Sequence, residues 1–109
     1  MSDWNKNLKL FDEMVARNPH FERKGKGMPY TSANGHMFSL LNKNGELGIR
    51  LPKEIAATFM KEYNTGEFRS HGATMREYVL VPDALLNDHV IMDKYLMESY
   101  SFVMSKPPK

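Results

Sequence analysis

Two arginines and a histidine surround a glycine in the segment FRSHGATMREYVLVP, residues 68–82. Arg69, His71 and Arg76, together with Arg50 earlier in the chain, are side chains of the types that bind anions. Guanidinium groups pair with phosphates and carboxylates through parallel hydrogen bonds, and histidine exchanges a proton near neutral pH. An anion site or a catalytic site requires that the fold bring these side chains to one pocket. The interpretation we favour is that they solvate a loop end around a turn.

The other combinations of reactive residues are incomplete. His89 and Asp93, four positions apart, and the pair His20 and Glu22 each offer two metal ligands, whereas tight sites normally use three or four. The sequence has no cysteine, which excludes thiolate chemistry, and no Gly-x-Ser-x-Gly segment that would favour a nucleophilic serine. Residues 24–27 are rich in glycine and lysine but lack the spacing of a phosphate-binding loop. We therefore expect no enzymatic activity, no metal and no cofactor.

The composition is that of a soluble globular protein. Of the 109 residues, 41% are hydrophobic and 26% are charged, and the net charge is +2. A chain of this size forms one domain, which we place at residues 1–109. No apolar stretch is long enough for a transmembrane helix and the first residues do not resemble a signal peptide, so we expect a cytoplasmic protein without membrane contact.

Positive charge is concentrated between residues 17 and 50. This stretch has two glutamates but six cationic residues, which are Arg17, Arg23, Lys24, Lys26, Lys43 and Arg50. Such a stretch can bind nucleic acid through phosphate contacts, and the interleaved Phe21, Tyr30 and Phe38 can stack on bases. A solvated surface is the simpler interpretation, because basic runs are usually solvated and these aromatic residues also stand where core residues are expected.

The spacing of apolar residues predicts the elements that position these side chains. Helical spacing predicts a first helix over residues 4–15. A period-two pattern over residues 21–51, broken by Asn34-Gly35 and Asn44-Gly45, predicts three strands joined as a meander. A two-residue turn at Asn34-Gly35 is expected to pair Ala33 with His36, Ser32 with Met37 and Thr31 with Phe38.

The second half of the chain predicts a helix over residues 52–63, a short strand at Phe68 and a longer strand over residues 75–81. After a helical turn, a last helix runs from Asn87 or Asp88 to about Ser105. Its expected core face consists of Ile91, Met92, Tyr95, Leu96, Phe102 and Val103. The order α-β-β-β-α-β-β-α indicates an α+β domain in which helices pack on one face of an antiparallel sheet.

Two surfaces remain for partners. The sheet face opposite the helices, carrying Arg50 and either His36 or Ser39, is expected to face solvent or a partner. The last helix is apolar over more of its circumference than one sheet covers, because a second apolar row lies beside its core face. This row, at heptad spacing, consists of Val90, Met97 and Met104. It is either a contact surface for another protein or a second copy of the chain, or a methionine-rich seam covered by the chain itself.

Several short motifs resemble the TfoX N-terminal domain family, first named from a bacterial competence regulator. They are Met28-Pro29 before a strand, Asn34-Gly35 followed by Met37-Phe38, Gly45 leading to Leu47 and Arg50, and Gly72-x-x-Met75-x-x-Tyr78-x-x-Val81-Pro82. The resemblance covers residues 21–109 and implies an α-β-β-β-α-β-β-α domain similar to that of secretion chaperones. The named regulator acts in transcriptional control, so the resemblance also implies a link to transcriptional or competence regulation.

The sequence thus predicts a small non-enzymatic binding or regulatory module. We expect its partner to be another protein or a second copy of the chain, bound either at the exposed sheet face or at Val90, Met97 and Met104 of the last helix. One alternative is nucleic-acid binding through residues 17–50. The other is a small-anion-binding protein or enzyme that uses Arg50, Arg69, His71 and Arg76.

Overall fold

The computed structural model of the chain describes residues 3–70 and 72–109. In chain order the elements are α1 (Trp4–Ala16), β1 (Tyr30–Ala33), β2 (His36–Leu41), β3 (Leu47–Arg50), α2 (Lys53–Glu62), β4 (Glu67–Ser70), β5 (Ala73–Val81), the 3₁₀ turn η1 (Asp83–Leu85) and α3 (His89–Met104). This order confirms the predicted α-β-β-β-α-β-β-α arrangement. Aspartates cap two of the helices: the side chain of Asp3 accepts a hydrogen bond from the Lys6 amide, and that of Asp88 accepts one from the Ile91 amide.

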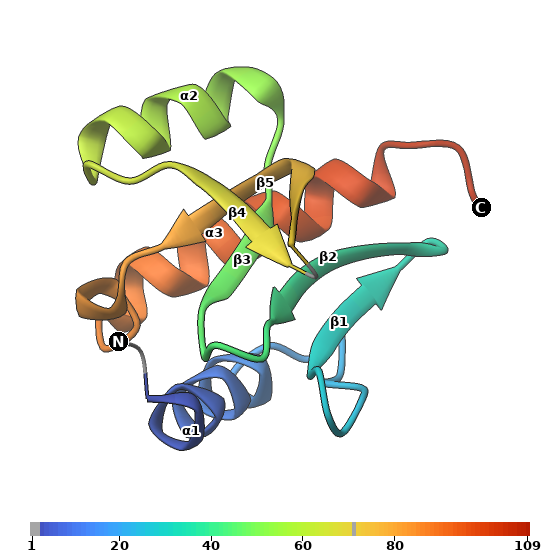
Figure 1. Cartoon of the computed structure of the whole chain (residues 1–109). Coiled ribbons are helices and arrows are strands. Elements are labelled where there is room, and N and C mark those ends of the chain that lie inside the picture. The colour runs from blue at the N-terminus through green and yellow to red at the C-terminus, as the bar shows by residue number, and fades with distance from the viewer. Residues whose placement is uncertain (1–2, 71) are drawn as a thin grey trace.

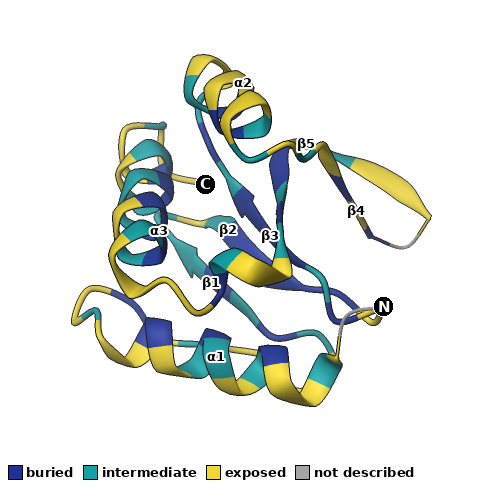
Figure 2. Ribbon diagram, turned by 90° about the vertical axis from the view of Figure 1, so that its left-hand side faces the viewer, coloured by how far each residue is buried: buried dark blue, intermediate teal, exposed yellow. Residues whose placement is uncertain are grey.

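The strands pair antiparallel in the order β1-β2-β3-β5-β4. Figure 1 shows α3 behind the sheet, α1 below it and α2 above it, and Figure 2 shows the same arrangement from the side. Side chains alternate along a strand, so Leu47 and Ile49 of β3 point to the same face. There they form a core with fully buried side chains from each helix, among them Phe11, Phe59 and Met92.

Ser99 links α3 to the sheet by a polar contact. The residue is fully buried, and its hydroxyl oxygen lies 3.0 Å from the carbonyl oxygen of Phe38 and 2.5 Å from that of Arg50. These carbonyls belong to an irregular part of β2 and to the last residue of β3. A buried carbonyl without a hydrogen-bond partner lowers stability, so the Ser99 hydroxyl, shared between the two carbonyls, stabilises the packing of α3 on the sheet.

The Asn34-Gly35 turn has the expected form. Both residues have positive φ, 57° for Asn34 and 80° for Gly35, as a two-residue hairpin turn requires. The first two expected pairs are confirmed, Ala33 with His36 and Ser32 with Met37.

The third expected pair is wrong, because β2 contains a bulge. Thr31 pairs with Ser39 instead of Phe38, and Phe38 turns its ring into the helix-side core, where it is fully buried. Ser39 pairs with Ile49 across β2 and β3, so its side chain also points to the helices and not to the opposite face. It is fully buried and hydrogen-bonds to the hydroxyl of Thr31. The expectation that Ser39 faces solvent is therefore wrong.

The expectation of an open sheet face opposite the helices is also wrong in part. The pairing of β4 with β5 is irregular at Phe68, and Glu77 has a φ of 70°, so β5 bends and the β4–β5 hairpin projects over the sheet (Figure 1). Phe68 is fully buried against Gly48 of β3. A second, smaller hydrophobic cluster results, built from Phe68, Leu40 and Tyr78.

Asn34 also caps the end of α3 from a distance. Its Nδ2 donates to the carbonyl oxygens of Val103 at 3.0 Å and Lys106 at 2.7 Å. Glycine tolerates positive φ but lacks this amide, so we expect Asn34→Gly to lower the free energy of unfolding, measured in urea, by about 1–2 kcal/mol. Asn64→Gly is the matched control, because Asn64 has a φ of 51° at the exposed end of α2. It should leave stability unchanged or slightly raised, and an equal loss for both variants would contradict the capping role.

Candidate functional site

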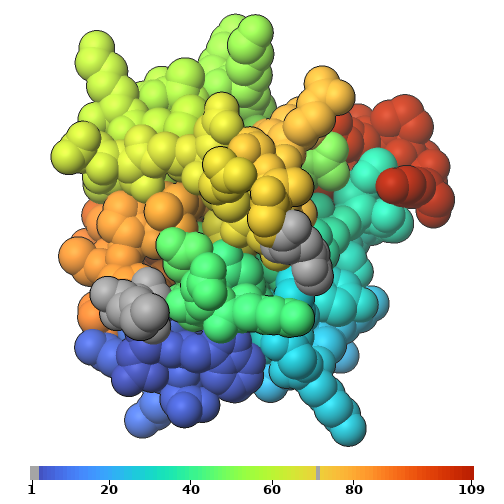
Figure 3. All heavy atoms as spheres, viewed as in Figure 1, coloured from blue at the N-terminus to red at the C-terminus, as the bar shows by residue number. Residues whose placement is uncertain are grey.

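A groove of about 820 Å³ lies between α2 and the β4–β5 hairpin. In the space-filling view α2 runs along the top of the molecule with the hairpin beneath it (Figure 3). The volume is in the range of ligand-binding clefts. We call this hollow the α2–β5 groove. Its walls are one face of α2 and residues 74–79 of β5, and they include Lys53, Ala57, Met60, Met75, Arg76 and Glu77.

The local sequence explains why this space stays open. α2 contributes Ala56 and Ala57 to the groove wall, and alanine side chains fill little volume. On the opposite wall Glu77 has a φ of 70°, where β5 bends. Among the described residues, the other side-chain-bearing positions with positive φ are asparagines, which tolerate it better than glutamate. Glu77 is therefore a strained residue in the wall of the groove.

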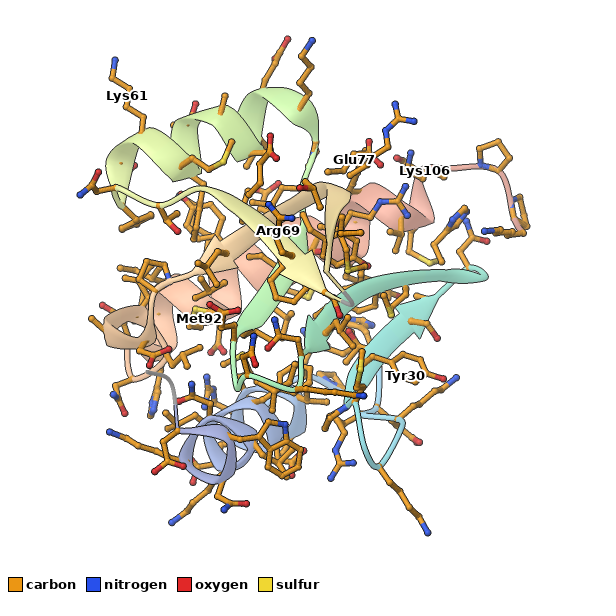
Figure 4. All side chains as sticks on the ribbon, viewed as in Figure 1. Tyr30, Lys61, Arg69, Glu77, Met92 and Lys106 are labelled. Carbon is orange, nitrogen blue, oxygen red and sulfur yellow. The ribbon has the colours of Figure 1, made fainter. Side chains whose placement is uncertain are left out.

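Two cations hold the carboxylate of Glu77. Its Oε1 accepts hydrogen bonds from Arg50 Nη2 at 2.6 Å and Nε at 3.0 Å, and its Oε2 lies 4.0 Å from Lys106 Nζ. Both cations also lie over the ring of Phe102, with Arg50 Cζ 5.8 Å and Lys106 Nζ 4.5 Å from its centroid. Figure 4 shows Glu77 close to Lys106 near the C-terminal end of α3. Phe102, expected in the core, is only half-buried and instead supports these cations.

Tyr78 lines the groove with a group that is already bonded. Its side chain is 6% exposed, and its hydroxyl donates to the carbonyl oxygen of Met37 at 2.7 Å. Burial raises the pKa of the Tyr78 phenol above its ordinary value, an effect that the nearby Arg50 guanidinium partly opposes. The phenol therefore keeps its proton at neutral pH and serves as a donor to the backbone.

The strain at Glu77 predicts an inverted preference between alanine and glycine. Both substitutions remove the carboxylate, but only alanine keeps a Cβ at positive φ. We expect Glu77→Gly to be about 1 kcal/mol more stable than Glu77→Ala in urea unfolding. At Glu67, a strand residue of β4 without positive φ, the order should reverse, with glycine the less stable by about 0.5–1 kcal/mol. The same order at both sites would contradict backbone strain at Glu77.

The structure separates the side chains predicted to bind an anion. Arg50 and Arg76 both line the α2–β5 groove. Arg69 lies on β4 at a different hollow, beside the β2–β3 turn, and its guanidinium donates to the Gly72 carbonyl at 3.3 Å (Figure 4). His71 lies outside the described residues. Within the described part of the chain, the predicted set therefore contributes Arg50 and Arg76 to one pocket.

The predicted partner row on α3 is interrupted. Val90 and Met104 are exposed, by 80% and 48%, but they lie at opposite ends of the helix. Met97 between them is partly buried, and its Sδ lies 2.7 Å from Nδ2 of Asn18, in the segment after α1. The chain's own α1–β1 connection thus covers the middle of the row.

The arginines of the basic stretch 17–50 take part in ion pairs. The pairs are Arg17 with Asp93 at 2.8 Å, Arg23 with Asp12 at 2.8 Å, and Arg50 with Glu77 at 2.6 Å. Its lysines, at positions 24, 26 and 43, are exposed. Phe21 and Phe38 are buried and pack edge to face with ring centroids 5.0 Å apart. Fewer cations and fewer aromatic rings are thus available to nucleic acid than the sequence suggested.

Several residues at the groove were not among the predicted site residues, among them Lys53 and Glu77 of its lining and Lys106, which contacts Glu77. Lys53 starts α2 only three positions after Arg50, so its proximity could have been inferred from the expected helix start. The sequence does not indicate the bend at Glu77, because glutamate is not typical of positions with positive φ. Lys106 reaches the site only through the packing of α3, which no local pattern specifies.

Residues 3–70 and 72–109 contain no group of three or more His, Asp or Glu side chains arranged to hold a metal ion. In the same part of the chain, every helix is too short or too polar to cross a lipid bilayer. Comparison of the chain with protein-family models and with curated proteins gives no match.

Proposed function

We propose that the chain is a non-enzymatic binding module of the TfoX N-terminal kind and that it holds a partner in the α2–β5 groove. Residues from the family-like motifs support this location, because Arg50, Met75 and Tyr78 all line the groove. The regulatory role implied by the resemblance would then be exerted through binding. The same proposal replaces α3 as the partner surface, since the apolar row there is interrupted at Met97.

The observation that carries the proposal is the strained backbone of Glu77 in the groove wall. A glutamate at a φ of 70° costs free energy, and such residues persist where the surroundings fix them, most often at functional sites. Here Arg50 and Lys106 fix the side chain. The bend at Glu77 places the hairpin opposite α2, so the strained residue and the shape of the groove are directly connected.

The polar groups of the groove are suited to binding rather than to catalysis. The Glu77 carboxylate is neutralised by Arg50 and Lys106, and the Tyr78 phenol is protonated and bonded to the backbone. A general base needs an available lone pair, whereas the Glu77 carboxylate already pairs with two cations and burial keeps the Tyr78 phenol protonated by raising its pKa. Lys53 and Arg76 are exposed cations, which suit recognition of an acidic group.

Blocking the groove tests the proposal. Amide chemical shifts of the ¹⁵N-labelled protein would be recorded with three probes: a pool of short random-sequence peptides, decanoate, and a single-stranded oligonucleotide. We expect one probe to shift amides of α2 and of the first half of β5. Ala57→Trp, which fills the groove, should abolish these shifts, whereas Ala16→Trp, at the exposed end of α1, should leave them intact. Absence of groove shifts with every probe would overturn the proposal.

A further inference from the structure

The geometry points to a specific occupant of the α2–β5 groove. We infer that the groove binds an extended segment of a partner protein that carries an acidic residue followed by apolar residues. This inference rests on the proposed function, because it names the class of partner for the same groove. It is drawn from the length of the groove, its apolar lining and the placement of its charges.

The groove has the length of a short extended segment. Its α2 wall runs from Lys53 to Met60, seven residues on, which is about 10 Å at the rise of an α-helix. An extended chain covers that length with about three residues. The α2 residues of the wall recur at the spacing of one helix face, at positions 53, 56, 57 and 60, so the wall is continuous along this length.

The middle of the groove is apolar and adaptable. Ala56 and Ala57 leave room on the α2 side, and Met60 and Met75 line the groove from α2 and from β5. Methionine side chains are flexible and polarisable, and they accept apolar groups of different shapes. The central part of an occupant therefore presents aliphatic or aromatic side chains.

The charges of the groove are arranged asymmetrically. Lys53 is exposed at the start of α2, and Arg76 is exposed on β5. The charge of the next residue, Glu77, is already matched by Arg50. The N-terminus of α2 adds partial positive charge at the same end. Glu67 lines the groove where β4 begins, five residues after the C-terminal end of α2. An acidic side chain is therefore favoured near Lys53 and Arg76 and disfavoured near Glu67.

The same features favour a peptide over the other occupants. The Glu67 carboxylate and the apolar middle of the groove do not suit the regular run of phosphates of a nucleic acid. A fatty acid such as decanoate satisfies the cationic end, but it presents one alkyl chain to an apolar lining that comes from both walls. An extended peptide supplies both the acidic side chain and a series of apolar side chains.

Two synthetic peptide pools of equal length test the inference. Both carry random apolar residues, and they differ at one end position, which is aspartate or glutamate in the acidic pool and lysine in the basic pool. Fluorescence anisotropy should show tighter binding of the acidic pool to the wild-type chain. The double variant Lys53→Ala/Arg76→Ala should weaken this binding about 3- to 30-fold, as expected for two exposed ion pairs. The matched control Lys61→Ala/Lys94→Ala removes two exposed lysines that do not line the groove and should change it little.

Charge reversal should reverse the preference between the two peptide pools, which a structural defect would not do. Lys53→Glu/Arg76→Glu should bind the basic pool better than the acidic pool. Unchanged preference, or equal binding of both pools by the wild-type chain, would overturn the inference. If decanoate or the oligonucleotide gives shifts that Ala57→Trp abolishes while the acidic pool does not bind, the peptide inference fails and the proposed binding function stands. If no probe occupies the groove, both fail.

Discussion

Phe68→Ala is expected to lower the free energy of unfolding by about 3–5 kcal/mol, the usual range for a fully buried phenylalanine. Phe68 is the side chain of β4 that packs on Gly48 and closes the second hydrophobic cluster. Its removal leaves a cavity between the hairpin and the sheet that the rigid strand β3 cannot fill. Urea unfolding gives the loss, and amide hydrogen exchange locates it.

The location of the effect is as informative as its size. We expect amides of β4 and of the first half of β5 to exchange faster in Phe68→Ala, relative to amides of β2 and β3, because the hairpin loses its anchor. Phe102→Ala is the matched control, since Phe102 is half-buried and contacts two cations instead of the core. It should cost about 1–2 kcal/mol. Equal losses for the two variants, or unchanged exchange in the hairpin, would contradict an anchoring role for Phe68.

Much of the fold could be predicted because its signals are local. The Asn34-Gly35 turn was identified from two residues that tolerate positive φ, and the structure confirms the two pairs next to it, Ala33 with His36 and Ser32 with Met37. The start of the last helix was placed at Asn87 or Asp88, and Asp88 caps it by accepting a hydrogen bond from the Ile91 amide. Such features depend on a few neighbouring residues, so periodicity and residue type are sufficient to place them.

The irregular parts of the sheet could not be predicted, because they arise from tertiary packing. The bulge at Phe38 turns its ring into the core formed by three helices, which period-two alternation does not reveal. The bend at Glu77 is stabilised by Arg50 and Lys106, which lie 27 and 29 positions away in the sequence. Neither cation has a local relation to β5.

The candidate site was predictable only in part for the same reason. Arg50 and Arg76 were identified from their chemistry, and the structure places both in the α2–β5 groove. Arg69 lies close to Arg76 in the sequence, but the hairpin turn between them reverses the chain. Arg69 therefore lies on β4, at another hollow. Proximity in sequence was therefore a poor guide, and the hairpin that separates these arginines also forms the groove wall.

The second cluster and the groove are two sides of the same hairpin. Phe68 and Met75 contribute to the small cluster on the sheet side, while Met75 and Glu67 also line the groove. Stability of the hairpin against the sheet thus determines the shape available to a partner. A substitution that disturbs the contact of Phe68 with Gly48 should alter both stability and binding in the groove, although neither residue lines it.

Gly48→Ala is the substitution that tests this contact most directly. A Cβ built on Gly48 would lie 2.3 Å from Cγ and Cδ2 of Phe68, well inside van der Waals contact. Alanine normally suits a strand better than glycine by about 0.5–1 kcal/mol, but here the ring or the hairpin must move. We expect Gly48→Ala to lower the free energy of unfolding by about 1–3 kcal/mol, as overpacked core positions do, measured in urea.

Two further variants separate this clash from a general effect of alanine. Gly66→Ala is the matched control, because a Cβ at Gly66 meets no atom within 4 Å, and stability should be unchanged or slightly higher. Phe68→Leu shortens the ring side chain, so the double variant Gly48→Ala/Phe68→Leu should lose less stability than the sum of the single losses. Strict additivity would show that Gly48 and Phe68 do not press against each other, and the hairpin would then need another anchor to hold the groove open.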